Sequence, residues 1–163
     1  KTRPMMPTIN TTTPSPKTVF FGVSPNAEKH GLPLLDFFVK KNYNKPVMFS
    51  EFIKESSGRD VRVYVVGSNV IASMLRNNPN DFRSNIALSG TGSDYPINEE
   101  TKAMCINIAK DLKLDFCGID LLFKNGNPSV ICEVNSNAMF AGINKACNVK
   151  IEESITKHIV NSI

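Results

Sequence analysis

Two acidic residues interrupt apolar segments in the second half of the sequence. Asp120 lies within residues 117–123 and Glu133 lies within residues 130–134, and the other residues of both segments are apolar or small. Asn135 follows Glu133 by two positions. A carboxylate in such a segment is costly to bury without a partner. These residues are therefore candidates for binding a cation.

The two acids fall on facing strands of an expected hairpin. A turn centred on residues 126–127 pairs Asp120 with Glu133 and Leu122 with Ile131 in an antiparallel ladder. Directly opposed residues have Cβ atoms about 5 Å apart, and two like charges at that separation destabilise the sheet. The pair therefore requires a compensating cation, or one carboxylate must be protonated.

The same register adds an amide oxygen to the two carboxylates. Because side chains alternate along a strand, Asp120, Glu133 and Asn135 project from one face. Two carboxylates and one amide oxygen suit Mg²⁺ or Mn²⁺, and magnesium shares its shell with phosphates, so the set indicates a nucleotide site. Two alternatives stay open. The acids lie on a solvated face or pair with Lys or Arg, or a one-residue register shift separates them.

Two arginines lie between the expected hairpins. Arg76 ends the first hairpin, and Arg83 follows within residues 77–93, which are expected to be polar and largely irregular. The planar guanidinium suits phosphate and carboxylate oxygens, and two arginines near a divalent cation suit phosphoryl transfer. Loops at strand ends are also where binding sites are usually built. The alternative is that both arginines are solvated surface residues.

The surrounding pattern predicts an α+β fold in which helices pack on a largely antiparallel sheet. Helices are recognised by apolar residues that recur every four positions, and strands by valine-rich segments separated by turns. In chain order, the expected elements are a strand at 19–21, a helix at 34–41, a strand at 47–53, a hairpin of 61–66 and 70–75, a helix at 99–112 capped by Asn98, a hairpin of 115–123 and 129–134, and a C-terminal helix with Ile151, Ile155 and Ile159 on one stripe.

Composition excludes several classes of protein. The chain has 163 residues, enough for one domain or part of a larger one, and its 41% hydrophobic content argues against disorder. The net charge is +4, and no run of basic residues is longer than the pair Lys40–Lys41, so neither nucleic acid nor a membrane is an expected partner. The chain begins at Lys1 rather than Met, so we expect an upstream part.

The cysteines predict neither a zinc site nor a disulfide framework. The four cysteines lie 12 to 15 residues apart, without a CxxC pair or a nearby histidine. Cys117 and Cys132 stand in apolar segments, where a free thiol acts as a small core side chain. Reduced, structural cysteines and the lack of a signal peptide or long apolar run favour a cytoplasmic protein.

Four segments together resemble the RimK-like ATP-grasp carboxylate–amine ligases, the family of the ribosomal-protein glutamate ligase. They are SEFIKESSGRDVRVYVVG, DFRSNIALSG, LDFCGIDLLF and CEVNSN, in the family's order and spacing. The resemblance runs from about Val47 to the C-terminus. It implies an ATP-grasp fold with an incomplete N-terminal part. Residues 1–46 would be a remnant of the N-terminal and central region, and residues 47–163 the C-terminal subdomain with the nucleotide and metal site.

The resemblance also implies a role for each site residue. Glu51 and Phe52 would hold the adenine, with Asp60 near the ribose. Catalysis would rest on Arg76 at the transferring phosphoryl group and on Arg83 and Asn85 at the phosphates and substrate. The expected magnesium ligands are Asp120, Glu133 and Asn135, the same residues that the hairpin register selects.

The implied activity is ATP-dependent formation of an amide bond. A carboxylate of a peptide, a protein C-terminus or a small molecule would be activated as an acyl phosphate and joined to an amino acid such as glutamate. The implied cofactors are ATP and Mg²⁺ or Mn²⁺. The family often forms dimers or tetramers, so a homo-oligomer is a further expectation. Two other functions stay open: a non-catalytic relic or interaction module, and an ATP-grasp phosphotransferase.

The sequence departs from the family pattern in two places. The family carries a strand with a nucleotide-binding lysine and then a glycine-rich loop before the SEFI-like segment, and neither is visible here. Family members usually follow the metal motif with Asn-Pro, whereas here Asn137 is followed by Ala138. The first departure favours the relic, and the second affects the backbone on the side of the amine acceptor.

Overall fold

The computed structural model describes residues 19–23, 40, 47–80, 84 and 90–163. The chain forms two compact units, Lys1–Phe52 and Ile53–Ile163. The predicted division of the chain after residue 46 stays a prediction. Of the helices in the described part of the chain, none combines the length and apolar character that crossing a bilayer requires.

The first unit contains two short strands. β1 (Val19–Val23) pairs with β2 (Val47–Glu51) in parallel, with Val19 opposite Val47. Both strands were predicted, although β1 extends two residues further and β2 ends two residues earlier than expected. The helix expected at 34–41 lies outside the described residues except for Lys40, which is helical.

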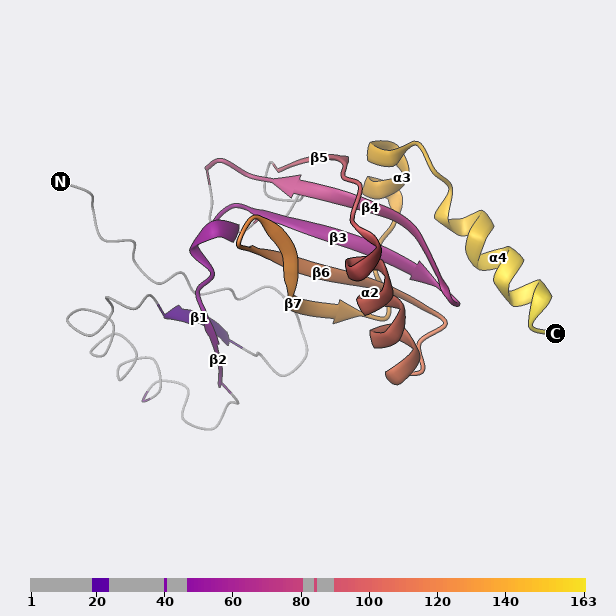
Figure 1. Ribbon diagram of the computed structural model, residues 1–163, viewed down its shortest axis with the longest axis horizontal. Helices are drawn as coiled ribbons and strands as arrows, with labels where there is room; N and C mark the ends of the chain where they lie inside the picture. Colours follow the sequence, from indigo (N-terminus) through magenta and orange to yellow (C-terminus); the bar gives the residue numbers. More distant parts are fainter. Residues whose placement is uncertain (1–18, 24–39, 41–46, 81–83, 85–89) are drawn as a thin grey trace. The chain divides into compact units, whose positions relative to one another are not determined.

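The second unit contains one five-stranded antiparallel sheet in the order β5-β4-β3-β6-β7. The sheet and its helices confirm the predicted α+β architecture (Figure 1). The elements are η2 (Lys54–Ser56), β3 (Arg59–Val66), β4 (Asn69–Asn77), β5 (Thr91–Asp94), α2 (Glu99–Asp111), β6 (Phe116–Lys124), β7 (Asn127–Asn135), α3 (Ala141–Cys147) and α4 (Ile151–Asn161).

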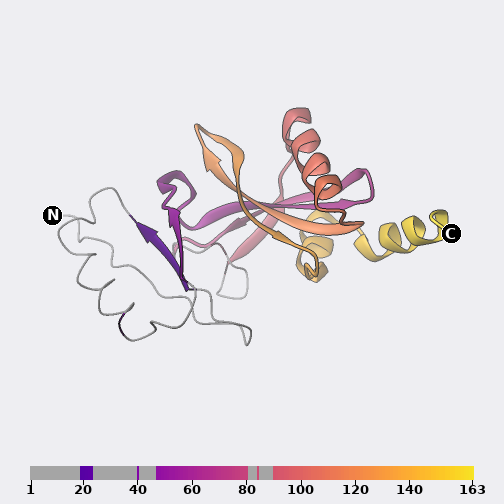
Figure 2. The ribbon, with the colours of Figure 1, turned by 90° about the horizontal axis from the view of Figure 1, so that it is seen from below.

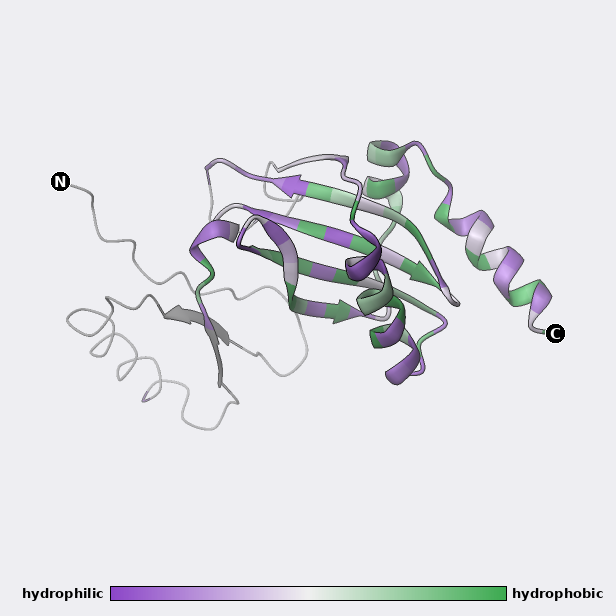
Figure 3. Ribbon diagram, viewed as in Figure 1, coloured by the Kyte–Doolittle hydropathy of each residue, from purple (hydrophilic) through white to green (hydrophobic). Residues whose placement is uncertain are grey.

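Residue alternation divides the sheet into two faces with different cores. Odd-numbered residues of β3 and β6, such as Val63 and Ile119, are fully buried in a cluster with Cys105 and Ala109 of α2. On the opposite face, Tyr64 packs with residues of α3 and α4. Figure 2 shows α2 and α3 on opposite sides of the sheet, and Figure 3 shows the apolar residues along the strands. Even-numbered residues of β3 and β6 therefore face the side of α3.

Local sequence signals explain where the second hairpin and α2 begin and end. Asn98 accepts a hydrogen bond from the backbone N–H of Thr101 at 2.8 Å, which confirms the predicted N-cap. The β6–β7 turn is Asn125-Gly126, with φ of 53° and 78°, as a type I′ hairpin requires. Glu55 of η2 accepts hydrogen bonds from both turn N–H groups, and these donors lower the pKa of its carboxyl. The hairpin tip is thus held from outside the hairpin.

Two expectations about these elements were wrong. β5 lies in a segment that was expected to be irregular. Its four residues are all exposed, so its sequence shows no alternation of apolar and polar residues. It is a strand because it pairs with β4. Cys132 is exposed because it lies on the edge strand β7, whereas Cys117 is buried as predicted. The predicted C-terminal helix is confirmed as α4. Ile151 is buried and Ile155 packs against the same core, whereas Ile159 is 54% exposed, so the apolar stripe packs over the first half of the helix.

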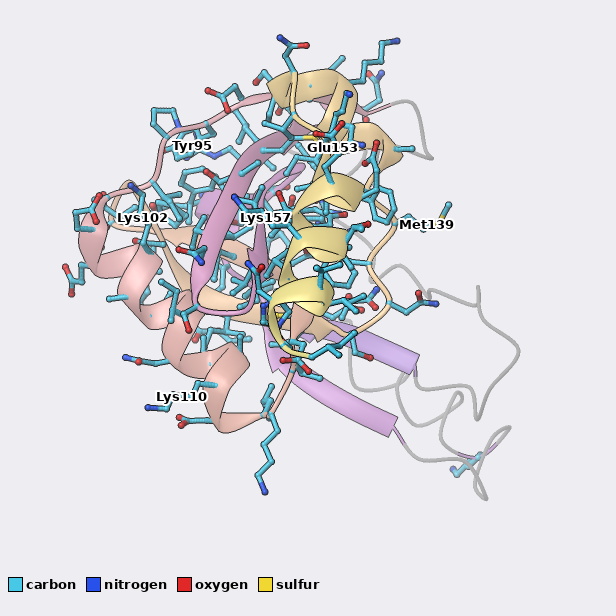
Figure 4. The ribbon with its side chains drawn as sticks, turned by 90° about the vertical axis from the view of Figure 1, so that its right-hand side faces the viewer. Tyr95, Lys102, Lys110, Met139, Glu153 and Lys157 are labelled. Atoms are coloured by element: carbon cyan, nitrogen blue, oxygen red, sulfur yellow. The ribbon has the colours of Figure 1, made fainter. Side chains whose placement is uncertain are left out.

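The loop after β7 packs closely on the face of α3. A Cβ atom added at Gly118 of β6 would lie 2.6 Å from the Cβ of Ala138, which is 3% exposed. The hydroxyl of Tyr64 donates to the backbone carbonyl of Met139. Met139 itself is 84% exposed and points away from the domain (Figure 4). Glycine at position 118 therefore allows the loop to lie directly on the sheet.

We predict that Gly118→Ala destabilises the protein by about 1–3 kcal/mol because the added methyl group overpacks this contact. Urea unfolding measures the loss. Ala138→Gly removes the opposing methyl group, so the double variant should recover part of the stability lost in Gly118→Ala. An additive double variant would show that this contact is not the cause.

Candidate functional site

Three adjacent strands bring four charged side chains together on the face of α3. Asp60 and Arg62 lie on β3, Arg76 on β4 and Asp120 on β6. In the ladder Asp60 stands opposite Arg76, and Arg62 stands opposite Asp120. All four positions are even-numbered, so none of these side chains enters the apolar core below α2. The sheet register alone therefore alternates basic and acidic groups across three strands.

Arg76 links two buried carboxylates. Its Nε donates to Oδ1 of Asp60 at 2.7 Å, and its Nη2 donates to the other Asp60 oxygen. The same Nη2 donates to Oδ2 of Asp120 at 2.8 Å. Asp60, Arg76 and Asp120 are only 5%, 7% and 5% exposed. A bidentate pair in such a buried position is strong and directional.

Arg62 forms a second bidentate ion pair, with Asp120. Its Nε and Nη2 donate to Oδ1 and Oδ2 of Asp120 at 2.6 and 2.7 Å. Asp120 therefore accepts three hydrogen bonds from two guanidinium groups. Sequence reasoning missed Arg62, because its partner is 58 residues away. The sequence signal that could have identified Arg62 is its position between valines in residues 61–65, which places a basic side chain on the opposite face of the strand from the valines.

The charges of this cluster balance one another. Burial alone would lower the pKa of Arg76, but hydrogen bonds and charge interactions with Asp60 and Asp120 raise it above its ordinary value. The pKa of Arg62 is also raised, because its pairing with Asp120 outweighs burial and the nearby charge of Arg76. Both arginines stay charged, and two carboxylates face two guanidinium groups. The cluster is therefore neutral overall, which is the condition for burying charges at acceptable cost.

The second predicted carboxylate stands beside this cluster. Asp120 is paired with Glu133, and Gly118 with Asn135, as the hairpin register predicted. The predicted pairing of Leu122 with Ile131 was wrong. Leu122 faces Val130 instead, because the ladder shifts between Asp120 and Leu121 and again between Leu122 and Phe123. These two irregularities compensate for a turn that lies closer to β6 than expected.

The donor chemistry of the predicted metal ligands fits a hard divalent cation. Asp120 and Glu133 stand directly opposite each other, and the Asn135 side-chain oxygen accepts a hydrogen bond from the backbone N–H of Asn137 at 2.8 Å. Within the described ranges no three His, Cys, Asp or Glu side chains form a group that could hold a metal ion, and the predicted set depends on the amide of Asn135 as its third donor. Asp120 also accepts hydrogen bonds from Arg62 and Arg76, so the alternative that an acid pairs with a basic residue is correct for Asp120.

The surroundings of the cluster disfavour a thiolate at Cys132, whose thiol is partly desolvated although the residue as a whole is exposed. Desolvation of the thiol, with the negative charges of Asp120, Asp60 and Glu133, raises the pKa of Cys132 to about 11. A protonated thiol is a poor nucleophile and a poor ligand. The chemistry of the site therefore rests on carboxylate, amide and guanidinium groups.

The structure leaves the roles of four other predicted site residues untested. Glu51 and Phe52 belong to the first unit, at and just after the end of β2. Arg83 and Asn85 lie outside the described residues. Their predicted roles at the adenine and the phosphates stay predictions. Asp60 was predicted to lie near the ribose, and in the structure its carboxylate binds Arg76.

We predict that Arg76→Met destabilises the protein by about 3–5 kcal/mol, because it leaves two buried carboxylates without a shared partner. Arg62→Met should cost less, because Asp120 then keeps Arg76 and the Arg62 side chain is 17% exposed. Lys102→Met breaks an exposed pair and should change stability by less than about 1 kcal/mol. Urea unfolding of the three variants tests this order, and equal losses for Arg76→Met and Lys102→Met would contradict it.

Curated proteins similar to this chain include two synthases and a probable glutamate ligase. Human N-acetylaspartylglutamate synthase A is 38% identical over 125 residues, which cover 76% of this chain and 32% of the relative. Beta-citrylglutamate synthase B of Danio rerio is 37% identical over 135 residues, which cover 82% of this chain and 33% of the relative. A probable alpha-L-glutamate ligase 1 of Shewanella sp. (strain MR-4) is 40% identical over 69% of this chain and 38% of the relative. The chain spans about a third of the length of these relatives.

Solved structures show the same fold. The ATP-grasp ligase PsnB, complexed with a phosphomimetic variant of its minimal precursor, Mg and ADP, matches with a TM-score of 0.54 and 25% identity, over 68% of this chain and 33% of PsnB. D-alanine–D-alanine ligase from Bacillus anthracis matches with a TM-score of 0.57 and 14% identity, over 80% of this chain and 47% of the ligase, which supports the fold alone. A family model described as the RimK-like ATP-grasp domain matches residues 35–159. The chain belongs to this RimK-like ATP-grasp family.

Proposed function

We propose that the protein is an ATP-dependent ligase that joins a carboxylate to an amino acid, such as glutamate, through an amide bond. The observation that carries the proposal is one face of the sheet in a chain of this family: two arginines and two carboxylates meet on β3, β4 and β6, and Glu133 of β7 stands opposite Asp120. The relatives named as glutamate ligases and synthases support the choice of amine.

Asp120, Glu133 and Asn135 are the residues that would hold Mg²⁺ or Mn²⁺. Each contributes an oxygen donor, and the ladder places the two acids opposite each other. A bound divalent cation would neutralise phosphate charge and orient the nucleotide. The ion pairs of Asp120 limit its capacity to bind a metal ion. A carboxylate has about four lone-pair sites, and hydrogen bonds from the two arginines occupy three of them. Asp120 retains room for one further contact.

In the proposed reaction, the carboxylate oxygen of one substrate attacks the γ-phosphorus of ATP, and ADP leaves. The amine nitrogen of the second substrate then attacks the acyl carbon and displaces inorganic phosphate. The protein supplies positioning and charge, since little covalent chemistry falls to its side chains. Arg76 would stabilise the transferring phosphoryl group, with Arg62 beside it and Arg83 and Asn85 at the phosphates. Glu51 and Phe52 would hold the adenine.

The substrates are proposed only as classes. The carboxylate belongs to a peptide, a protein C-terminus or a small molecule, and the amine belongs to an amino acid. Assembly into a homo-oligomer and a location in the cytoplasm are parts of the same proposal.

We predict that the full-length protein binds a non-hydrolysable ATP analogue more tightly with Mg²⁺ than without it. Calorimetry measures both affinities. The variant Asp120→Asn with Glu133→Gln should lose most of the magnesium effect, at least about tenfold in Kd, because its oxygen donors are no longer anionic. Asp111→Asn with Glu100→Gln removes the same charge from exposed positions on α2 and should keep the effect. Magnesium dependence that persists in the first variant would place the cation elsewhere.

Product analysis separates the three possible activities. With ATP, Mg²⁺, glutamate and a panel of carboxylates, the ligase should release ADP and phosphate and form an amide. A phosphotransferase would give ADP and a phosphorylated acceptor without free phosphate. A folded, full-length protein that binds no nucleotide would support the non-catalytic module instead.

A further inference from the structure

Tyr64 stands between the charged cluster and the loop that follows Asn135. It lies on β3 and is fully buried, and its even-numbered position places it on the face of α3 together with Arg62. The proposed reaction uses Arg62 but gives Tyr64 no role. A buried tyrosine needs a partner for its hydroxyl group, so the partner shows what the residue holds.

The hydroxyl group of Tyr64 holds the backbone of the loop. It donates to the backbone carbonyl of Met139, although the Met139 side chain is exposed. Burial raises the pKa of this hydroxyl, and the nearby charge of Arg62 only partly opposes the effect. The hydroxyl therefore stays protonated at neutral pH and remains a donor. The loop is thus fixed through its backbone rather than through the side chain of Met139.

The fixed loop lies beside the side chain of Arg62. Cδ of Arg62 and Cζ of Tyr64 each lie 3.8 Å from the position that a Cβ atom of Gly118 would take. Cβ of Ala138 lies 2.6 Å from the same position, so these three side chains surround one backbone position of β6. Gly118 also stands opposite Asn135 in the ladder. The loop is therefore fastened to the sheet close to the point where it begins.

The same loop orients the side chain of Asn135. The Asn135 side-chain oxygen accepts a hydrogen bond from the backbone N–H of Asn137 at 2.8 Å. An amide oxygen has two lone pairs, so one remains for a cation. The direction of that lone pair depends on where the Asn137 N–H lies, and the bond from Tyr64 holds the chain two residues further on. Hydrogen-bond partners outside the coordination shell commonly orient metal ligands in this way.

We propose that Tyr64 is a positioning residue for Asn135. Its hydroxyl group fixes the loop at Met139, and the loop directs the Asn135 oxygen toward the proposed cation. Tyr64 acts through the backbone of the loop and does not contact the cation itself. This inference rests on the metal site of the proposed function.

The test removes only the hydroxyl group, in the variant Tyr64→Phe of the full-length protein. The EPR signal of free Mn²⁺ measures binding of the ion in the presence of a non-hydrolysable ATP analogue. We expect Kd for Mn²⁺ to rise at least about threefold, because Asn135 is no longer held in its binding orientation. Tyr95→Phe makes the same change in the core on the side of α2 and should leave this Kd unchanged. Equal Kd values for Tyr64→Phe and the wild type would overturn the proposal.

An Asn135→Ala background separates positioning from general damage to the fold. This background keeps Asp120 and Glu133 as ligands but lacks the side chain that Tyr64 is proposed to position. Tyr64→Phe should therefore change Kd for Mn²⁺ by less than about twofold in it. A loss as large as in the wild-type background would show that Tyr64 does not act through Asn135.

A readout without metal or turnover distinguishes this inference from the proposed function. In NMR spectra of the metal-free protein, the backbone N–H of Asn137 should exchange with water faster in Tyr64→Phe than in the wild type. The N–H of Thr101, which the Asn98 side chain holds in the same way, should not change. If the wild type binds no Mn²⁺, the proposed metal site fails, and the exchange rate still decides whether Tyr64 holds the loop. Equal Asn137 rates in both proteins would reject the positioning role.

Discussion

The organisation of the site depends on one buried carboxylate shared by two arginines. Asp120 lies in the central part of the sheet, where a charge without a partner would be very costly. Arg62 reaches it from the neighbouring strand β3 and Arg76 from β4, which lies one strand further away, and Asp60 balances the second arginine. Each of these contacts requires the strands to be paired in one register, since a shift by one residue would move a charge into the apolar core. The contacts of the charged cluster therefore form in only one sheet register, and they stabilise that register over its alternatives.

The two faces of the sheet have separate tasks. The face covered by α2 holds the valine and isoleucine side chains that stabilise the sheet, and the opposite face carries the charges at one end and Tyr64 at the other. Tyr64 and Gly118 fix the loop that follows Asn135. The same strands that form the core therefore also position the donors and the loop beside them, so the geometry of the site is supported by rigid elements.

Short-range signals made part of this arrangement predictable. The acids at 120 and 133 lie close to the turn of one hairpin, so alternation and a turn expected at 126–127 paired them. The turn lies at 125–126, and two irregularities in the ladder restore the expected pairing of the acids. The pairing of β3 with β6 joins residues 58 positions apart, and no local pattern reports it. For that reason Arg62 became visible only in the structure. The contact of Asp60 with Arg76 lies within the β3–β4 hairpin and was missed because the expected hairpin, 61–66 with 70–75, stopped one residue short of both. β5 was missed because edge pairing, rather than its own sequence, makes it a strand, and the exposure of Cys132 follows from the edge position of β7.

The central claim is that Asp120 serves both the arginine cluster and a divalent cation shared with Glu133 and Asn135. A crystal structure of the full-length protein with an ATP analogue and Mn²⁺ tests it most directly, because the anomalous signal of manganese locates the ion independently of the protein. The account predicts a manganese ion coordinated by Asp120, Glu133 and Asn135, with Arg76 still bound to Asp60. A manganese ion bound elsewhere, with Asp120 contacting only Arg62 and Arg76, would contradict it.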